Sequence, residues 1–539
     1  MAGVTLTRSM HPRLKILLGL VGVFLVLLGL HAPLLSLPYF WDEAGYYIPA
    51  ALDFYRSGML IPQSTLPTGH TPLVTIYLAM AWRVLSFSPL VTRAAMLLLA
   101  SATVGAVYAL GRRVASREAA VWAAALLAVM PLFFAQSSLA HLDLAAALFT
   151  TLALLFLLEQ RIWKFALAAS LAILSKETAV VLLPVAWAYM WRHKPDAQEA
   201  GNNRRGVHRK HSFGNSLALV IPLLPLAAWS LYYHHATGYW TGNREYLSYN
   251  LTGTLAPGRI FWALLRRLYE TFIGGFNWVL AAAALAGVWY RRRGRVQTPE
   301  TSPPAERSAD APGGSGPSFS VLQRKFVLLA LGLAATYLLL LSVVGGAVLP
   351  RYLLPVFPPL ILLAVLLLWQ LPIKRARLVC GVGLTCLVVA NFLNPPYPFP
   401  FEDNLAYADF VRLHQQAARF LSGRPGQPRI LTAWPASDEL ARPFLGYVRE
   451  PLRVVPVAGY SEDDFRAVQP ESFDVLYLYS RKWQPRVNAL EGLPWLARAQ
   501  QRYFGYQPQA RESLIIARYR LTLIGEFERR GQWVRIYAK

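Results

Sequence analysis

Apolar runs long enough to cross a bilayer recur through the first 393 residues of this 539-residue chain. A membrane-spanning helix needs about 17–25 predominantly apolar residues. Only 15% of the residues are Asp, Glu, Lys or Arg, whereas an average soluble protein carries roughly 25%. We therefore predict an all-α polytopic membrane module of about eleven transmembrane helices with additional juxtamembrane helices, followed by a small soluble α/β domain.

The net charge of +24 follows from the positions of the basic residues. Lys and Arg gather in short segments between the apolar runs, at 112–117, 161–164, 192–210, 291–325 and 374–377. This alternation is typical of cytoplasmic loops under the positive-inside rule. We therefore predict no nucleic-acid partner. We also predict a multi-pass protein of the cell inner (plasma) membrane, with a cytoplasmic N-terminus and an exoplasmic, or periplasmic, C-terminal domain.

The same alternation divides the chain into two predicted domains. Residues 1–395 form the transmembrane module, whose first exoplasmic loop spans 36–91. Residues 296–319 are rich in Pro, Ser and Gly and cannot bury apolar area, so they are predicted to be a disordered cytoplasmic linker. A split pair of helices within 164–191 is expected to meet on the exoplasmic side at "SKET" (175–178).

Residues 396–539 are predicted to form an exoplasmic α/β domain of unknown role. "LAYADFVRLHQQAARFL" has helical periodicity, while three short runs rich in β-branched and aromatic residues indicate strands. The last 19 residues, "LTLIGEFERRGQWVRIYAK", are typical of a hairpin that turns at "RRGQ". Helices alternating with short strands favour a partly parallel sheet.

Polar side chains converge on one exoplasmic membrane boundary in this topology. Charged groups at membrane depth are costly and usually face a cavity or a partner. Their convergence from four separate loops indicates a functional site. The candidates are Asp42, Glu43, His70, Asp143, Lys176, Glu177 and Arg351, with His141 and Tyr352 beside them.

The acidic candidates and their neighbours also have purely structural interpretations. Asp42 and Glu43 stand where a helix cap is expected, and Asp143 can cap the next helix or pair with a cation. Lys176 and Glu177 can pair with each other in their turn. These interpretations stay open beside the functional one.

The other candidates have structural alternatives as well. His70 can belong to a proline-ordered turn, and His141 can be an interfacial group rather than a ligand. Arg351 and Tyr352 can anchor the chain at the headgroup level, where Arg and Tyr are favoured.

The functional interpretation combines a base with cations at a lipid surface. A carboxylate such as Asp42 can take a proton from an attacking hydroxyl or amine. Lys176 and Arg351 can neutralise a phosphate leaving group. The sequence has no Gly-rich nucleotide-binding loop, so the phosphorylated partner is predicted to enter from the bilayer.

Five motifs in this order resemble the GT-C glycosyltransferases, specifically the branch of protein O-mannosyltransferases and lipid A aminoarabinose transferases. The resemblance covers about residues 14–393. The motifs are "DE" after the first apolar run, "GHTPL" (69–73), a second acid at Asp143, "LAILSKET" (171–178) and "RYLLPVFPPL" (351–360).

This resemblance implies an enzyme that takes a sugar, hexose or pentose, from a polyprenyl-phosphate carrier. It would transfer the sugar with inversion to an exoplasmic lipid, glycan or protein. Asp42 matches the family's catalytic carboxylate, and Asp143 matches its second acidic position. Lys176 and Arg351 match basic residues that meet the carrier phosphate.

Four further assignments rest on the same resemblance. His70 stands where the family has a His or an acid before "P-L", and Glu43 is a supporting member of the "DE" pair. "SKET" replaces the family's commoner "TKG", which adds Glu177 beside the phosphate-binding Lys176. His141 stands near Asp143, where many relatives carry an Arg.

A divalent cation held by Asp42, His70 and Asp143 stays open, and we predict no required cofactor. Two other functions also remain open: a transporter or flippase of a lipid-linked or anionic substrate, and a non-catalytic receptor. A transporter is expected to show inverted repeats and charges near the membrane midplane. The sequence places its charges at one boundary and has no evident repeat.

Overall fold

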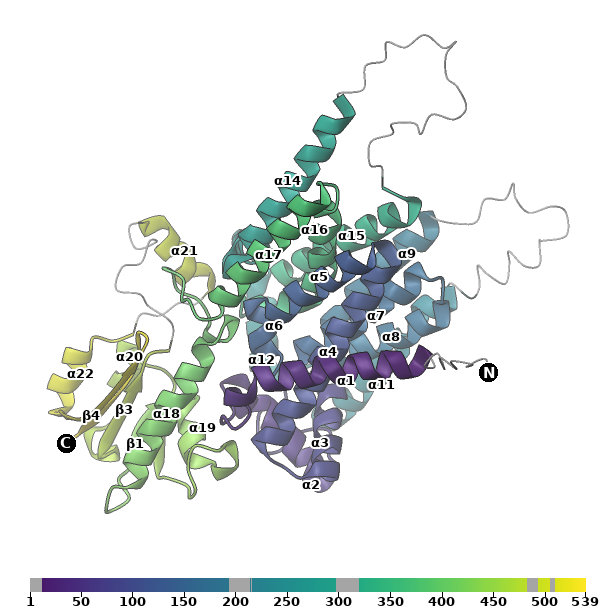
Figure 1. The fold of residues 1–539 in the computed structure, drawn as a ribbon. Helices are drawn as coiled ribbons and strands as arrows, with labels where there is room; N and C mark the ends of the chain where they lie inside the picture. Colours follow the sequence, from purple (N-terminus) through teal and green to yellow (C-terminus); the bar gives the residue numbers. More distant parts are fainter. Residues whose placement is uncertain (1–11, 193–213, 215, 297–318, 482–492, 505–508) are drawn as a thin grey trace, which may run out of the picture.

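The computed structural model describes residues 12–192, 214, 216–296, 319–481, 493–504 and 509–539. A helical bundle precedes a five-stranded sheet, which lies with its helices at one side of the bundle (Figure 1). The predicted linker at 296–319 falls, apart from its end residues, outside the described residues. The bundle helices are α1 (Pro12–Leu30), α2 (Ile48–Ser57), α3 (Leu73–Leu85), α4 (Pro89–Val114), α5 (Arg117–Val129), α6 (Pro131–Gln136), α7 (Leu142–Leu158), α8 (Ile162–Ser175), α9 (Leu182–Arg192), α11 (Leu223–Thr237), α12 (Arg244–Asn250), α13 (Pro257–Phe272), α14 (Asn277–Val296), α15 (Val321–Val343), α16 (Phe357–Leu368) and α17 (Ile373–Ala390).

Four helices among the described residues are long and apolar enough to cross a membrane by length and composition. A bent pair, Pro257–Phe272 with Gly274–Tyr290, raises this number to five if the pair is one span. Other apolar helices are shorter, at 10–17 residues. The protein is thus a multi-pass membrane protein, and the number of eleven spans stays a prediction. The four helices are Pro89–Val114, Ser216–Thr237, Val321–Val343 and Pro350–Leu368.

Local breaks in the apolar runs explain several of the short helices. Pro131 begins α6 directly after α5, where a ring without an N–H does not continue the preceding helix. The pair α13–α14 bends by 42° near Gly275, whose φ of 59° is left-handed. The predicted split within 164–191 is confirmed: α8 ends at Ser175, and Lys176 takes an extended backbone before α9.

The tail forms one mixed sheet in the order β2-β1-β3-β5-β4. Strand β1 pairs in parallel with β2 and β3, whereas β5 is antiparallel to β3 and β4. The hairpin turns at Arg530 and Gly531, whose φ angles of 49° and 78° suit a two-residue turn of left-handed residues. The predicted partly parallel α/β tail is therefore confirmed. The strands are β1 (Ile430–Ala433), β2 (Val454–Val457), β3 (Val475–Tyr479), β4 (Thr522–Arg529) and β5 (Gln532–Ala538).

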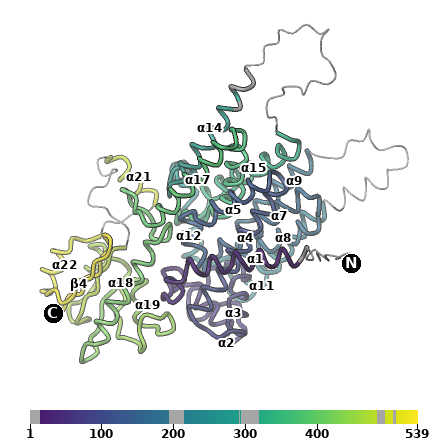
Figure 2. The backbone as a smooth tube through the Cα atoms, viewed as in Figure 1, coloured from purple at the N-terminus to yellow at the C-terminus, as the bar shows by residue number. Residues whose placement is uncertain are grey.

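Five α-helices are described in the tail, and the predicted helix at 405–421 is the first of them. They are α18 (Ala406–Ser422), α19 (Ala436–Ala441), α20 (Glu462–Arg466), α21 (Pro494–Phe504) and α22 (Glu512–Tyr519). The tail, coloured green to yellow in Figure 2, lies along one side of the bundle. The domain boundary at 395 stays a prediction.

The tail contacts the first loop of the bundle through specific hydrogen bonds. The Tyr39 amide donates to the Leu445 carbonyl at 3.2 Å, and the Tyr447 hydroxyl donates to the Tyr39 carbonyl at 3.0 Å. The hydroxyls of Ser138 and Tyr407 lie 3.2 Å apart. These bonds hold the loop that carries Asp42 between the bundle and the tail.

A close approach at Gly45 makes this docking testable. A Cβ atom on Gly45 would lie 2.6 Å from Cζ2 of Trp434 and 2.8 Å from its Nε1. We expect Gly45→Ala to destabilise the docked state by about 1–3 kcal/mol, since overpacking forces a shift of ring or backbone. Thermal unfolding of the purified protein measures this cost. Gly22→Ala is the matched control, because nothing lies within 4 Å of that Cβ position; equal melting temperatures for both variants would contradict the docking.

Candidate active site

Three carboxylates from distant parts of the chain converge on one buried guanidinium. Arg351 lies on the 3-10 turn Pro350–Val356 and is 0% exposed. Its Nη1 donates to Oε2 of Glu402 at 2.8 Å, its Nη2 donates to Oδ2 of Asp42, and its Nε lies 3.6 Å from Oδ2 of Asp143. The planar guanidinium offers several fixed donors, so one Arg can hold several acids.

Lys176 supplies a second buried cation beside this cluster. Its Nζ donates to Oδ1 of Asp143 at 2.6 Å and lies 3.8 Å from the ring centroid of Tyr352. The Arg351 guanidinium lies 5.3 Å from the same ring. The extended backbone at Lys176, between α8 and the turn Glu177–Val181, carries this side chain to Asp143. Tyr352 thus lies against both cations.

Asp42 is the carboxylate of this cluster that solvent reaches best. Its side chain is 18% exposed, compared with 1% for Asp143 and 5% for Glu402. It directly precedes the short π-helix Glu43–Tyr47, and Trp41 before it has a left-handed φ of 48°. A molecule that arrives from water therefore meets Asp42 before the other two acids.

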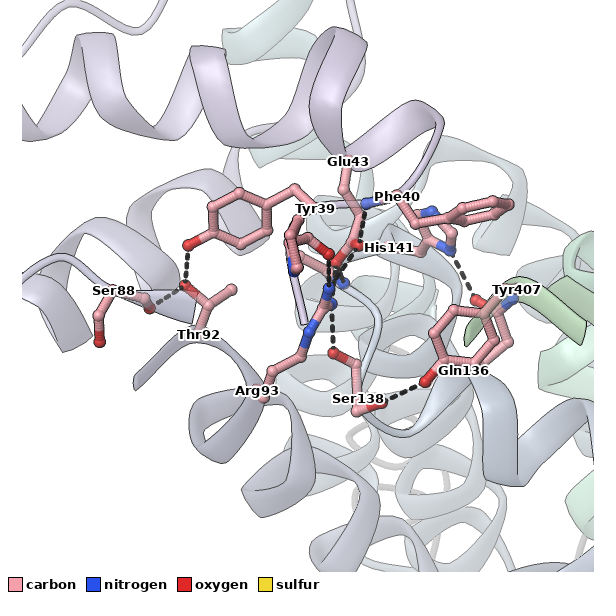
Figure 3. A network of polar contacts seen from close by, with 12 residues as sticks. Tyr39, Phe40, Glu43, Ser88, Thr92, Arg93, Gln136, Ser138, His141 and Tyr407 are labelled. Atoms are coloured by element: carbon pink, nitrogen blue, oxygen red, sulfur yellow. Dashed lines mark hydrogen bonds and ion pairs between the residues drawn. The ribbon is translucent and has the colours of Figure 1, made fainter. Parts of the chain in front are cut away.

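Glu43 faces a different partner, the buried Arg93 of α4 (Figure 3). Arg93 Nη2 donates to Oε2 of Glu43 at 2.9 Å, and its Nη1 donates to Oε1. The amides of Phe40 and Ala140 donate to the same carboxylate at 2.9 and 2.5 Å. Glu43 is 0% exposed. It therefore forms a buried structural ion pair, whereas the sequence interpretation grouped it with the catalytic acids.

His141 accepts a hydrogen bond from Arg351 and donates one to Gln136. Arg351 Nη1 lies 3.1 Å from Nε2 of His141, and Nδ1 of His141 lies 2.7 Å from Oε1 of Gln136. Burial, and then the charge of Arg351, lower the pKa of His141 well below its ordinary value. His141 is consequently a neutral acceptor that adds no charge to the cluster.

His70 and Glu177 form a separate pair. Nδ1 of His70 lies 3.0 Å from Oε1 of Glu177, and its Nε2 lies 3.4 Å from the Tyr246 hydroxyl. The ring of Tyr47 lies 6.5 Å from that of His70 and 5.7 Å from that of His141, so it stands between this pair and the Arg351 cluster. A cavity of about 40 Å³ borders the pair, and its lining includes Tyr46, Tyr47, His70, Thr71, Trp229 and Tyr233.

The structure thus places the sequence-predicted residues in three groups. One surrounds Arg351, one is the His70–Glu177 pair, and one is the Glu43–Arg93 pair. The first group holds most of the candidates: Asp42, His141, Asp143, Lys176, Arg351 and Tyr352.

Sequence reasoning missed two charged residues, Glu402 and Arg93. Glu402 and Asp403 follow an apolar run and the aromatic stretch "PYPFPF", much as Asp42 and Glu43 follow "PYFW". The sequence therefore contains two acidic pairs that follow an apolar run, and the second pair could have been recognised by its likeness to the first. Arg93 looked like an ordinary residue at the start of an apolar run, and it gave no comparable signal.

The residues present do not form a metal site. Among the described residues, no three His, Cys, Asp or Glu side chains are grouped as ligands for an ion. His70 pairs with Glu177, while Asp42 and Asp143 both face Arg351. We derive no step through a metal.

Comparisons with known proteins give a family-model match over part of the chain and a similar fold among solved structures. A family model described as dolichyl-phosphate-mannose-protein mannosyltransferase matches residues 69–229. No curated protein sequence matches the chain. The structure of ArnT from Cupriavidus metallidurans in the apo state is similar at 14% identity and a TM-score of 0.53, over 98% of each chain. ArnT bound to undecaprenyl phosphate gives 13% identity and a TM-score of 0.51, again over 98% of each chain.

The archaeal oligosaccharyltransferase AglB from Archaeoglobus fulgidus, in complex with an inhibitory peptide and a dolichol-phosphate, is more distant. It has 13% identity and a TM-score of 0.45, over 87% of this chain and 70% of that chain. The similarity to ArnT spans bundle and tail alike, so the whole chain shares that fold. The family model falls on the bundle, across the segment that contains His70, Asp143 and Lys176. The chain therefore has the fold of ArnT, and residues 69–229 of its bundle match the family model of the dolichyl-phosphate-mannose-protein mannosyltransferases.

Proposed function

We propose that this protein transfers a sugar from a polyprenyl-phosphate-linked donor to an exoplasmic acceptor, with inversion at the anomeric carbon and with Asp42 as the general base. The acceptor is a lipid, a glycan or a protein, and the sugar is a hexose or a pentose. The observation that carries the proposal is the contact of Asp42, the most exposed acid of the cluster, with the buried Arg351.

The charges of the cluster suit both the acceptor and the phosphate leaving group of such a reaction. Arg351 and Lys176 are the cations available to a phosphate, and both are buried, where electrostatic stabilisation of a leaving group is strong. Asp42 is within reach of an acceptor from solvent. Because Asp42 and Arg351 are in direct contact in this structure, the sugar of the donor is proposed to separate them when it binds, with the acceptor on the Asp42 side and the phosphate on the Arg351 side.

The proposed step balances as a single displacement. The acceptor hydroxyl oxygen attacks the anomeric carbon and forms the new glycosidic bond, while its proton moves to the Asp42 carboxylate. The bond between the anomeric carbon and the phosphate oxygen breaks, and its electron pair leaves with the polyprenyl phosphate. Arg351 and Lys176 stabilise the negative charge that develops on that oxygen.

Asp143 and Glu43 have supporting roles in this proposal. Asp143 holds Lys176 at 2.6 Å and so fixes the second cation. Glu43 fixes the loop that presents Asp42, through its bonds to Arg93 and to two backbone amides. The pair His70–Glu177 borders the cavity next to Tyr47 and is proposed to contact the sugar.

The donor class and the orientation rest on the membrane and on the relatives. A structural relative is bound to undecaprenyl phosphate, which supports a lipid carrier for this chain. The basic residues Arg112 and Arg113 end α4 on the side that the positive-inside rule assigns to the cytoplasm. We therefore place the active site and the tail on the exoplasmic side of the inner membrane.

Proteoliposomes offered radiolabelled polyprenyl-phosphate sugars test this proposal. With a membrane extract as the acceptor, wild-type protein is expected to consume one donor and to release polyprenyl phosphate, whereas empty vesicles do neither. The panel contains hexose and pentose donors, so the productive donor identifies the sugar. Movement of intact donor between leaflets without release of the sugar would instead support a flippase.

A further inference from the structure

The segment after the last bundle helix inserts an acid, Glu402, into the active site. Glu402 lies on the 3-10 turn Phe401–Asp403 and is 4% exposed. Its carbonyl accepts a hydrogen bond from Nε2 of Gln136 at 3.3 Å, and Asn404 Nδ2 donates to the Leu393 carbonyl at 3.1 Å. The turn is therefore fixed to the bundle on both sides of the carboxylate.

Glu402 contacts the reaction machinery at one point. Its Oε2 accepts from Arg351 Nη1 at 2.8 Å, while its Oε1 has no hydrogen-bond partner among the described residues. A carboxylate that binds a guanidinium through one oxygen is displaced more readily than a fork-to-fork pair, because fewer hydrogen bonds are broken. The Glu43–Arg93 pair, with two such bonds, shows the stronger arrangement in the same chain.

The charge balance of the cluster favours the release of one acid from Arg351 when a phosphate binds. In their ionised forms, Asp42, Asp143 and Glu402 carry three negative charges, against two positive charges on Arg351 and Lys176. A donor phosphodiester adds one more negative charge to a buried site that already has an excess of one. Like charges at such distances repel strongly in a low dielectric.

The other two acids are committed to other tasks. Asp42 must stay ionised to act as a base, and Asp143 is held by Lys176 at 2.6 Å. Glu402 has Arg351 as its one ion-pair partner in the described residues.

We propose that Glu402 is a resting-state counter-ion that occupies Arg351 in the empty enzyme and gives up this guanidinium when the donor phosphate binds. This inference rests on the proposed function, since it assigns Arg351 to the phosphate. Glu402 is then a positioning residue: it keeps Arg351 aligned and its charge compensated between turnovers, and it sets how tightly the lipid phosphate binds.

The titration of Glu402 supports this exchange. Burial raises the pKa of Glu402 to about 7; Arg351 opposes the shift, and Asp42 and Asp143 add to it. The neighbouring Asp403 has a pKa well above its ordinary value because of burial and then the charges of Glu402 and Glu270, with Arg266 of α13 opposing. His141 is neutral, so it supplies no compensating charge.

The raised pKa of Glu402 determines the direction in which pH changes binding of the phosphate. Below pH 7 Glu402 binds a proton, its hold on Arg351 weakens, and the phosphate replaces it without adding to the excess of negative charge. Above pH 7 the phosphate must displace an ionised carboxylate. If binding requires the protonated form, affinity falls about tenfold between pH 6 and pH 8, in step with the protonated fraction.

Binding of undecaprenyl phosphate to the full chain in nanodiscs tests the proposal. For wild type we expect affinity to fall about tenfold from pH 6 to pH 8. Glu402→Gln is expected to bind about tenfold more tightly than wild type at pH 8 and to lose most of this dependence. Because both proteins bind the same lipid, comparing them cancels the titration of the phosphate itself.

Two further variants keep the test decisive. Asp403→Asn is the matched control: it changes the adjacent acid, which has no hydrogen bond to Arg351 among the described residues, and should bind like wild type. Glu402→Asp keeps the charge and should keep the pH dependence even if Glu402→Gln fails to fold.

The outcomes separate this inference from the proposed function. If Glu402→Gln binds undecaprenyl phosphate as wild type does, or more weakly, the inference is overturned, because Glu402 then has a purely structural role. Binding of the lipid by wild-type protein would in that case still support the proposed donor class. No binding of undecaprenyl phosphate by folded wild-type protein overturns both.

Discussion

Asp42→Asn is expected to lower the rate of sugar transfer by about three orders of magnitude, within the range of roughly 10²–10⁴ for loss of a general base. The amide has nearly the shape of the carboxylate but cannot take the acceptor's proton. Because Arg351 also loses one of its three acids, the donor phosphate should bind at least as tightly as in wild type. The rate constant therefore falls while donor affinity does not.

Transfer in proteoliposomes and binding of undecaprenyl phosphate measure these two quantities separately. Glu245→Gln is a matched control, because Glu245 is an exposed acid in the first turn of α12 and has no contact with Arg351 among the described residues. Burial raises the pKa of Tyr46 to about 12, and the charges of Asp42, Asp438 and Glu245 add to that shift. A variant at Asp42 with undiminished transfer would remove the proposed base, and an equal loss at Glu245 would indicate a general field effect.

The second large effect is a loss of stability when the ion pair between Glu43 and Arg93 is broken. Glu43 and Arg93 are 0% and 1% exposed, and two backbone amides also donate to the carboxylate. Removing one partner of a buried ion pair leaves the other charge uncompensated and costs about 3–5 kcal/mol. Arg93→Met and Glu43→Gln are each expected to lower the melting temperature strongly and to reduce the folded yield.

The double variant separates this ion pair from other causes of instability. Arg93→Met combined with Glu43→Gln removes both charges, so it should cost clearly less than the sum of the two single changes. Thermal unfolding of the four proteins in one detergent gives this coupling. Additive effects would show that the two side chains do not depend on each other, against the geometry of Figure 3.

Substitution of these two adjacent acids is thus expected to have different effects: loss of sugar transfer at Asp42 and loss of stability at Glu43. The reason lies in the local backbone. Trp41 has a left-handed φ of 48°, and the π-helix Glu43–Tyr47 begins at once after Asp42. Successive side chains on a helical turn point in different directions, so one acid faces Arg351 while the next faces Arg93. The sequence motif "DE" contains no information about that division.

The order of residues along the chain was sufficient to predict the helices, strands and turns that depend on local periodicity. Runs of apolar residues predicted a membrane bundle, and the break at "SKET" predicted the turn that carries Lys176. Alternation and turn residues predicted the mixed sheet and its hairpin at Arg530 and Gly531. Each of these features depends on residues close together in the chain.

Only the tertiary structure decided which charged groups meet. Arg351 and Asp42 are 309 positions apart, and Arg93 and Glu43 are 50 apart. Such contacts depend on how long loops and packed helices bring distant segments together, and no short sequence pattern encodes that path. The sequence alone therefore determined a membrane bundle with charged residues at its boundary and a mixed-sheet tail. The docking of the turn Phe401–Asp403 against α6 decided that Glu402 faces Arg351, because Gln136 holds that turn beside the guanidinium.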